Sequence, residues 1–392
     1  MSSRRTPRLR KRPKVALVVE TSLAPGREIL RGIAQYVREC GAWSVYHQPR
    51  SLEESAPRWL RRWHGDGIIV RLQNRRLFEA VRASGLPAVD VLGVANDGSI
   101  PLVHVDDAAI ARMACEHLHD RGFRHFGFVG NLHESFSDAR RDAFVTAVEA
   151  CECTCEVFEA PFRSLKEDSW EKHLERLSRW VAALPRPAGV MLCSDQRGPE
   201  VIEACRAAEI SVPDEFAVIG VDNDETLCEV SQPSLSSVWP DHTRVGYRAA
   251  ELLDHLMSGS ETPKAPLLLA PVRVIPRLST DAWAIEDRYI AAAVQFIRKY
   301  GCDGIGVADV VSRFPFSRSV LQRRFRNALG RTVHDEIIRV RLARARELLT
   351  ETNLPMAIIA EQAGFKHQEY MGAVFKAKIG QTPAQLRRAA RD

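Results

Sequence analysis

Short apolar segments alternate with longer amphipathic ones through most of this 392-residue chain, and this alternation restricts the fold more than any other feature. The apolar segments predict buried strands, and the amphipathic segments predict helices. Strands separated by helices of this length form βαβ units with parallel sheets. About 260 residues with this pattern are more than a single hydrophobic core usually accommodates, so we expect two α/β lobes. The predicted strands are Lys14–Glu20, Ser44–His47, Gly67–Val70, Ala88–Val91, His125–Gly130, Gly189–Cys193, Phe216–Gly220 and Leu267–Leu269; the predicted helices are Pro25–Glu39, Ala108–Arg121, Arg140–Ala150, Trp170–Ala183 and Pro199–Ala208.

The pattern changes after Asp281, and beyond Ile285 it is helical to the end of the chain. This last part contains an internal repeat with an offset of 50 residues. Leu321, Phe325, Gly330 and Thr332 recur as Met371, Phe375, Gly380 and Thr382. Upstream, 310–316 aligns with 359–365 at an offset of 49, so the second copy has one extra turn residue.

Each copy of the repeat is predicted to be a helix, a short turn and a second helix. In the first copy, the helix Ala308–Phe314 ends at Pro315, and Ser317 caps the next helix. That second helix carries Arg318, Gln322, Arg323, Arg324 and Arg326 around an apolar stripe. In a helix-turn-helix unit such a helix enters the major groove of DNA. A single copy could equally be a basic, solvated helix of an ordinary bundle, but the repetition favours DNA binding.

The charge distribution also indicates a polyanionic partner for the C-terminal part. The net charge is +5. Residues 1–14 carry +7 and residues 286–392 carry +8, which leaves −10 on residues 15–285. A basic helical block attached to an acidic body is typical of a protein whose helical block binds nucleic acid. The basic tail could contact DNA phosphates or simply be solvated.

The helical block resembles the AraC-type DNA-binding domain over about 100 residues. The resemblance rests on Leu321-Gln322-Arg323-Arg324-Phe325, Gly330-Arg331-Thr332, Ile359-Ala360, Gly364-Phe365, Phe375-Lys376 and Gly380-Gln381-Thr382-Pro383. It implies two helix-turn-helix units joined by a long helix, here Val333–Thr350. It also implies base-reading positions at Arg318, Ser319, Gln322 and Arg323 in the first unit, and at Gln368, Glu369, Gly372 and Ala373 in the second.

The second unit departs from this pattern, because Gly372 and Ala373 offer no hydrogen-bonding side chain to a base. Gln368 is therefore the strongest reading candidate in that unit. Arg331 and Lys376 are expected to meet phosphates if the helices dock in this way.

The N-terminal part is similar to the sugar-binding domain of LacI/GalR-type regulators and periplasmic binding proteins. The similarity lies in 216–223, 235–238, Cys193-Ser194-Asp195, Arg140…Phe144 and the segment from Val105 to Gly122. It implies two α/β lobes with a sugar in the cleft between them. Asp222 and Asp195 follow predicted strands, where ligands of open α/β sheets bind. Their carboxylates could accept hydrogen bonds from sugar hydroxyls, and Arg140 could donate to the sugar. Asn223, Glu20 and Arg27 are further candidates, since the loop from Glu20 to Arg27 should also face the cleft. Alternatively, Asp222-Asn223 is a simple turn and Arg140 a solvated helix start.

The order of these parts, with the sugar domain first, resembles the xylose-responsive members of the AraC type. We therefore expect a basic tail (1–13), a sugar-binding domain (14–277), a linker (278–286) and a DNA-binding domain (287–392). The resemblance implies a homodimeric transcriptional activator of xylose catabolic genes, with D-xylose as effector and with double-stranded DNA and RNA polymerase as partners. Another pentose or hexose as effector remains as an alternative, and a sugar receptor and a sugar-metabolising enzyme agree much less well with the residues.

Other features exclude several classes of function. We find no P-loop, G-x-G-x-x-G turn or G-x-S-x-G elbow, so we expect no enzyme activity and no cofactor. No apolar run is long enough for a membrane span or a signal peptide, which predicts a cytoplasmic protein with reduced cysteines. Cys151-x-Cys153-x-Cys155 lacks a second pair or a histidine at metal-ligand spacing, so we expect no metal site.

Overall fold

The computed structural model describes residues 12–40, 43–51, 56–161, 167–263, 265–282 and 287–389. The chain divides into two compact units, here called the α/β unit (1–119 and 123–282) and the helical unit (120–122 and 283–392). Residues 1–11 of the predicted tail and 283–286 of the predicted linker lie outside the described residues.

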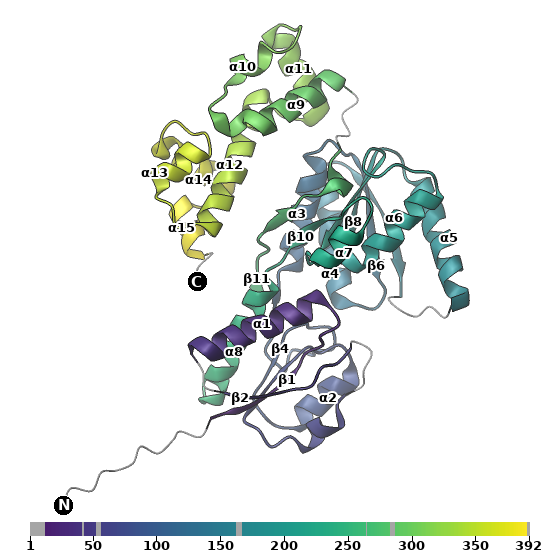
Figure 1. The fold of residues 1–392 in the computed structure, drawn as a ribbon, viewed down its shortest axis with the longest axis vertical. Coiled ribbons are helices and arrows are strands. Elements are labelled where there is room, and N and C mark those ends of the chain that lie inside the picture. Colours follow the sequence, from purple (N-terminus) through teal and green to yellow (C-terminus); the bar gives the residue numbers. More distant parts are fainter. Residues whose placement is uncertain are drawn as a thin grey trace, which may run out of the picture. The chain divides into compact units, whose positions relative to one another are not determined.

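The N-terminal lobe of the α/β unit is a parallel sheet in the order β2-β1-β3-β4 (Figure 1). Helices α1 and α8 lie on one side of it, and α2 with the short helix η1 on the other. Helices α1 and α8 approach closely because Gly32 and Gly246 have no side chain: a Cβ on Gly32 would lie 1.8 Å from the Thr243 carbonyl oxygen. The elements are β1 (Lys14–Val18), β2 (Ser44–His47), β3 (Gly67–Val70), β4 (Ala88–Asp90), α1 (Ala24–Glu39), η1 (Arg58–Arg62), α2 (Arg75–Ala83) and α8 (His242–Met257).

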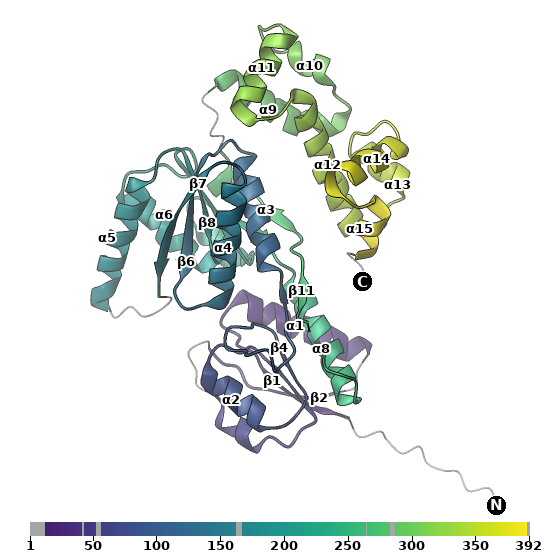
Figure 2. The same ribbon diagram turned by 180° about the vertical axis from the view of Figure 1, so that it is seen from behind.

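The C-terminal lobe contains a larger sheet in the order β12-β10-β9-β8-β6-β7, in which only β12 is antiparallel to its neighbour. Helices α5 and α6 cover one face of this sheet, and α3 and α4 lie against the other (Figure 2). The elements are β6 (His125–Asn131), β7 (Thr154–Ala160), β8 (Ala188–Leu192), β9 (Phe216–Val221), β10 (Ser236–Trp239), β12 (Arg273–Ile275), α3 (Asp107–His119), α4 (Ser135–Glu149), α5 (Glu167–Ala183), α6 (Gly198–Ala207), α7 (Glu225–Val230), η2 (Asp195–Arg197) and η3 (Leu278–Thr280).

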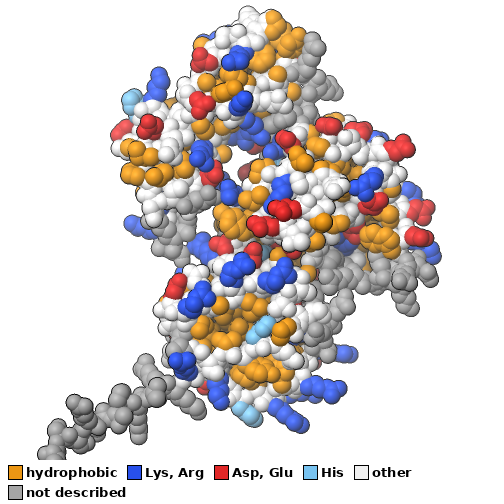
Figure 3. All heavy atoms as spheres, viewed as in Figure 1, with side chains coloured by type: hydrophobic (Ala, Val, Ile, Leu, Met, Phe, Trp, Pro, Cys, Tyr) orange, Lys and Arg blue, Asp and Glu red, His pale blue; other side chains and the backbone are white. Residues whose placement is uncertain are grey.

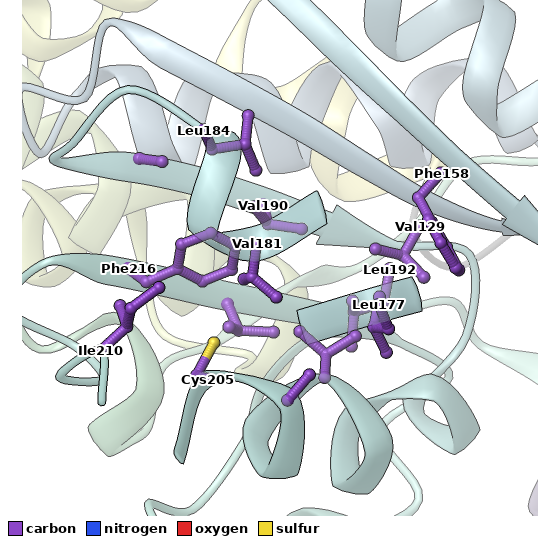
Figure 4. Close-up of a cluster of buried hydrophobic side chains, with 14 of the residues drawn as sticks. Val129, Phe158, Leu177, Val181, Leu184, Val190, Leu192, Cys205, Ile210 and Phe216 are labelled. Atoms are coloured by element: carbon purple, nitrogen blue, oxygen red, sulfur yellow. The ribbon is translucent and has the colours of Figure 1, made fainter. Parts of the chain in front are cut away.

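The core of this lobe forms where strands and helices bring apolar side chains together from distant parts of the sequence. Figure 4 shows Phe216 of β9 and Val190 of β8 facing Val181 of α5 and Cys205 of α6, all fully buried. Because strand side chains alternate between faces, the remaining residues of β8 and β9 pack on the other side of the sheet. The lobe is therefore a sheet with a core on each face.

The chain passes from one lobe to the other after β4, after β10 and after β11, so both lobes depend on all three connections. Strand β5 (Val103–Val105) pairs with β11 (Leu267–Leu269) in a separate parallel pair along this path. Most predicted strands and helices are present, but β5, β7, β10, β12, α2, α7 and α8 were not predicted. The edge strand β7 was missed because only part of it is buried, so it lacks the apolar run that we searched for.

The helical unit repeats one arrangement twice along α12 (Val333–Glu351). Leu321 and Phe325 are buried against the first part of α12, and Met371 and Phe375 are buried against the second part. Gly330 and Gly380 end their helices with positive φ values of 69° and 83°, which glycine adopts without strain. The elements are α9 (Arg288–Tyr300), η4 (Gly301–Asp303), α10 (Val307–Val311), α11 (Arg318–Leu329), α13 (Met356–Gln362), α14 (Gln368–Ile379) and α15 (Pro383–Ala389).

These observations confirm the predicted fold class: a two-lobed α/β unit with parallel sheets, followed by an all-α unit with two helix-turn-helix arrangements. Among the described residues, no helix combines the length and the apolar character needed to cross a bilayer.

Candidate functional site

A cavity of about 150 Å³ lies in the α/β unit, at the carboxyl ends of strands from both lobes. This is where ligands bind in open α/β sheets. Most of the lining residues are polar, and four of them are apolar. The lining residues are Leu23, Pro25, Arg71, Gln73, Asn74, Leu92, His104, Asn131, Glu134, Phe136, Arg140, Ser194, Gln196, Asp222 and His242.

Arg140 of α4 is the central cation of this cavity, and it is 2% exposed. Its Nε donates to Asp107 Oδ1 at 2.7 Å, its Nη1 donates to the Cys193 carbonyl, and Asp222 Oδ1 lies 3.9 Å from Nη1. Burial alone would lower the pKa of Arg140, but Asp107 and Asp222 outweigh it and raise the pKa. Arg140 is thus a fixed, fully charged donor, and the alternative of a solvated helix start does not apply to it.

Two buried histidines extend this network into the cavity. His242 Nε2 lies 3.1 Å from Asp222 Oδ1, and its Nδ1 has no hydrogen bond from any described residue. Burial lowers the pKa of His242, although Asp222 opposes that shift, so the ring favours its neutral form. His104 Nε2 lies 3.5 Å from Asp107 Oδ2. Neutral imidazoles can both donate and accept, as a sugar hydroxyl requires.

Asp222 is held in a backbone conformation that non-glycine residues rarely adopt. Its φ is 103°, and that of Asn223 is 50°. Such conformations persist only where the surroundings enforce them, and they cluster at ligand sites. Asp195 enforces this one: its Oδ2 accepts the Asp224 amide at 2.8 Å, and its Oδ1 accepts the Ser237 hydroxyl at 2.7 Å. Ser237 in turn accepts the Asn223 amide.

Asp195 does not line the cavity, because it is 1% exposed and lies behind the Asp222 loop. Burial, and next the charge of Asp222, raise the pKa of Asp195 well above its usual range. The sequence predicted direct sugar contact for this residue; the structure instead gives its oxygens to backbone and hydroxyl donors of the protein.

The other three predicted sugar-site residues also lie outside the cavity lining. Asn223 Oδ1 accepts from Arg277 at 2.8 Å. Glu20 is buried and accepts from Arg71 Nη1 at 2.8 Å, so that it orients a lining arginine. Arg27 is largely exposed and donates to the carbonyls of residues 21 and 22.

The sequence analysis missed several lining residues. Arg71, Asn131 and Ser194 all belong to the ends of parallel strands or the positions just after them. Asp222 was predicted because ligands bind at the carboxyl ends of parallel strands, and the same criterion applied to every strand would have identified these residues. Glu134 and Phe136 lie in the loop and first turn before Arg140, and nothing in the sequence alone marks them as cavity residues.

In the helical unit, the first predicted reading surface is the exposed side of α11. Arg318, Ser319 and Arg323 are exposed, and Gln322 is half-buried one turn after Arg318. The Ser317 hydroxyl caps this helix by accepting the Val320 amide. The side chains are free of the core and can extend toward base edges.

Arg331 differs from the expectation of a phosphate contact. Its side chain is 16% exposed, and its Nε donates to Glu336 Oε2 at 2.6 Å. Glu336 is fully buried on α12. The Arg331 guanidinium compensates the charge of a buried carboxylate and so stabilises the fold of the helical unit.

The second predicted reading surface is the start of α14, where Gln368 and Glu369 are exposed and bond to each other at 3.2 Å. Lys376 lies two turns further on and is also exposed. On the face drawn in Figure 3, basic and acidic side chains both appear on the helical unit, so no uniform basic field covers that face.

The described residues contain no group of three or more His, Cys, Asp or Glu side chains that could hold a metal ion. Cys151, Cys153 and Cys155 are free thiols.

Comparisons with known proteins match both units. Periplasmic binding protein-like domains match residues 115–280, and helix-turn-helix domains match residues 310–389. The xylose operon regulatory protein of Haemophilus influenzae is 30% identical, over 95% of this chain and 98% of that protein. The protein of the same name from Escherichia coli is 30% identical, over 96% of this chain and 97% of that protein.

Solved structures agree with these relatives. The structure of a xylose-binding transcription activator is 28% identical, with a TM-score of 0.61, over 97% of this chain and 98% of that one. A transcriptional regulator in complex with cellobiose is 22% identical, with a TM-score of 0.56 over 68% of this chain and 84% of that one, and supports the α/β fold alone. Relatives that match the whole chain are regulators, which confirms the expectation that it is not an enzyme. The chain belongs to the family of xylose operon regulatory proteins, transcriptional regulators in which a sugar-responsive, periplasmic-binding-protein-like domain precedes an AraC-type helix-turn-helix domain that binds DNA.

Proposed function

We propose that D-xylose is the effector of this regulator and that it binds in the cavity around Arg140 and Asp222. The observation that carries the proposal is the buried network of Arg140, Asp107, Asp222 and His242, which presents fixed polar groups to a small cavity. The name of the xylose-binding activator that this chain resembles supports xylose as the ligand.

The chemistry of the lining suits a small polyol. Each sugar hydroxyl donates one hydrogen bond and accepts others, and the cavity offers both kinds of partner. Asp222 and His242 would accept from hydroxyls, while Arg140 and Asn131 would donate to them. Leu23, Pro25, Leu92 and Phe136 provide apolar surface for the C–H groups of the sugar ring.

The lining comes from both lobes, which suggests how the sugar acts. Arg71 follows β3 of the N-terminal lobe, and Asp222 follows β9 of the C-terminal lobe. A sugar that bonds to both would favour the closed arrangement of the lobes, and only such differential binding can shift the equilibrium. Closure would then change how two DNA-binding units are presented within a homodimer.

For DNA binding, we assign base reading to Arg318, Ser319, Gln322 and Arg323 of α11, and a weaker contribution to Gln368 and Glu369 of α14. Arginine and glutamine make bidentate contacts to guanine and adenine. Lys376 would contact a phosphate. As an activator, the bound dimer would recruit RNA polymerase to xylose genes. The proposed domains are the tail (1–13), the sugar domain (14–277), the linker (278–286) and the DNA-binding domain (287–392).

Titration calorimetry of the full chain against a panel of pentoses and hexoses tests the effector. We expect D-xylose to bind most tightly and to change the affinity of the full chain for its operator DNA in a gel-shift titration. Tighter binding of another pentose or a hexose would reassign the effector, and binding of no sugar would overturn the proposal. Sedimentation of the protein with and without DNA tests the dimer.

A further inference from the structure

We infer that Glu134 is a specificity-determining residue of the cavity, which admits an uncharged sugar and excludes its anionic derivatives such as the aldonate. This inference rests on the proposed function, since it concerns which sugars the same cavity accepts.

Glu134 differs from the other carboxylates at the cavity because no described residue donates a hydrogen bond to it. Asp222 bonds to His242, and Asp107 bonds to Arg140. Glu20, behind the lining, bonds to Arg71. Glu134 precedes α4, but its side chain makes no cap hydrogen bond to that helix. Its acceptor capacity is thus uncommitted within the described part of the chain.

The loop that carries Glu134 holds an unusual conformation. The preceding residue, His133, has a φ of 65°, in the left-handed region. A strained residue in the turn between β6 and α4 is consistent with a loop whose path is set by the site and not by local preference. Glu134 is half-buried and lines the cavity together with Arg71 and Arg140.

The cations of the cavity are already neutralised. Arg71 Nη1 lies 2.8 Å from Glu20, whose side chain is fully buried. Arg140 Nε lies 2.7 Å from Asp107, and Asp222 lies 3.9 Å from the same guanidinium. An entering carboxylate or phosphate would therefore find no uncompensated positive charge. It would instead meet the carboxylates of Glu134 and Asp222 in a partly buried site, where repulsion between like charges is stronger than in water.

A neutral sugar uses the same groups favourably. Its hydroxyls can donate to the free oxygens of Glu134, and hydrogen bonds to a charged acceptor are stronger than those to a neutral one. The same carboxylate would then both bind the sugar and exclude the acid. Glutamine at this position keeps the shape and the acceptor oxygen but removes the charge.

The test measures binding of D-xylose, D-xylonate and xylitol to wild type, Glu134→Gln and Glu149→Gln by calorimetry. Glu149 is an exposed carboxylate at the other end of α4 and serves as the matched control. Xylitol is open-chain and uncharged, so it separates loss of the ring from gain of charge. Thermal melting confirms that each variant is folded.

In wild type we expect xylonate to bind at least tenfold more weakly than xylitol. In Glu134→Gln the affinity for xylonate relative to xylitol should rise by about tenfold or more. Glu149→Gln should leave the ratio unchanged. An unchanged ratio in Glu134→Gln, or equal binding of xylonate and xylitol by wild type, overturns the inference while D-xylose binding still stands. If wild type binds none of the neutral compounds, the proposed function fails as well.

Discussion

The cavity of the α/β unit and the reading helices of the helical unit use the same residue types in opposite ways. In the cavity, Arg140 is buried and its charge is matched by Asp107 and Asp222. On α11, Arg318 and Arg323 are exposed and form no salt bridge with any described residue. In the first arrangement, the desolvation penalty of the buried charges is part of the free energy of folding. The donors are then already rigid when a small ligand binds. The second leaves the charges hydrated and, in the proposed function, available to DNA.

Charged side chains thus fall into two classes: those that are paired and stabilise the fold, and those that are exposed and available to a partner. Arg331 lies in the helical unit but belongs to the first class, because it serves the buried Glu336. Position within a DNA-binding unit therefore does not by itself identify a DNA contact.

The largest effect is expected at the cavity. Asp222→Ala removes an acceptor for the sugar and leaves His242 and Arg140 without one of their partners. We expect it to cost about 2–5 kcal/mol of sugar affinity, measured by calorimetry with D-xylose. Glu225→Ala, at an exposed position shortly after it, is the control and should bind as wild type does. Wild-type affinity in a folded Asp222→Ala protein would falsify the assignment.

Arg331→Ala should lower the stability of the full chain. Its loss takes from the buried Glu336 one of its charged donors, which costs about 1–3 kcal/mol. Urea unfolding monitors this change, and Arg323→Ala should shift the unfolding free energy by no more than about 0.5 kcal/mol. If Arg331→Ala unfolds as wild type does but flattens the salt dependence of DNA binding, Arg331 is a phosphate contact after all.

The two reading helices should contribute unequally to sequence specificity. Arg323→Ala should relax the preference at one or two base pairs by about 1–3 kcal/mol each, because a long bidentate donor is lost from α11. Gln368→Ala should cost less, since the neighbouring positions Gly372 and Ala373 offer no hydrogen-bonding side chain that would read a base together with Gln368. Binding-site selection on randomised DNA measures both. Equal specification of the two half-sites would show that DNA deformability, or the turn at 368–370, carries the second half.

The smallest effect is expected at Lys376. Its replacement by alanine should weaken binding to all DNA sequences alike and reduce the slope of log affinity against log salt by about one. Lys378 is the matched control, because its ammonium lies 3.7 Å from Asp335 and is partly engaged. A sequence-dependent loss in Lys376→Ala would contradict a phosphate contact.

Periodicity and repetition in the sequence were sufficient for the architecture. Strands such as Ser44–His47, Gly67–Val70 and Leu267–Leu269 have the predicted bounds, because a short apolar run between turns has few alternatives. The helix-turn-helix repeat could also be predicted from the sequence, because Phe325 and Phe375 are buried at equivalent positions of the two copies. Among the residues predicted for the sugar site, Arg140 and Asp222 line the cavity.

The tertiary structure decided which polar residues line the cavity and which lie behind the lining. The sequence pattern also placed four other residues at the cavity: Asp195, Asn223, Glu20 and Arg27. In the structure, the polar atoms of their side chains form hydrogen bonds with other groups of the protein. Conversely, His104 and His242 come from β5 and α8, which the sequence analysis did not predict.

The physical reason is that local sequence specifies the period of burial along each element, whereas the direction of a polar side chain depends on partners far along the chain. Arg331 illustrates this for the helical unit: its position next to the turn suggested a phosphate contact, whereas the structure pairs its guanidinium with the buried carboxylate of Glu336 on α12. The sequence by itself determined the two units, their order and the helices that can read DNA. The tertiary structure determined the cavity, because its walls are assembled from both lobes and from strands separated by more than a hundred residues.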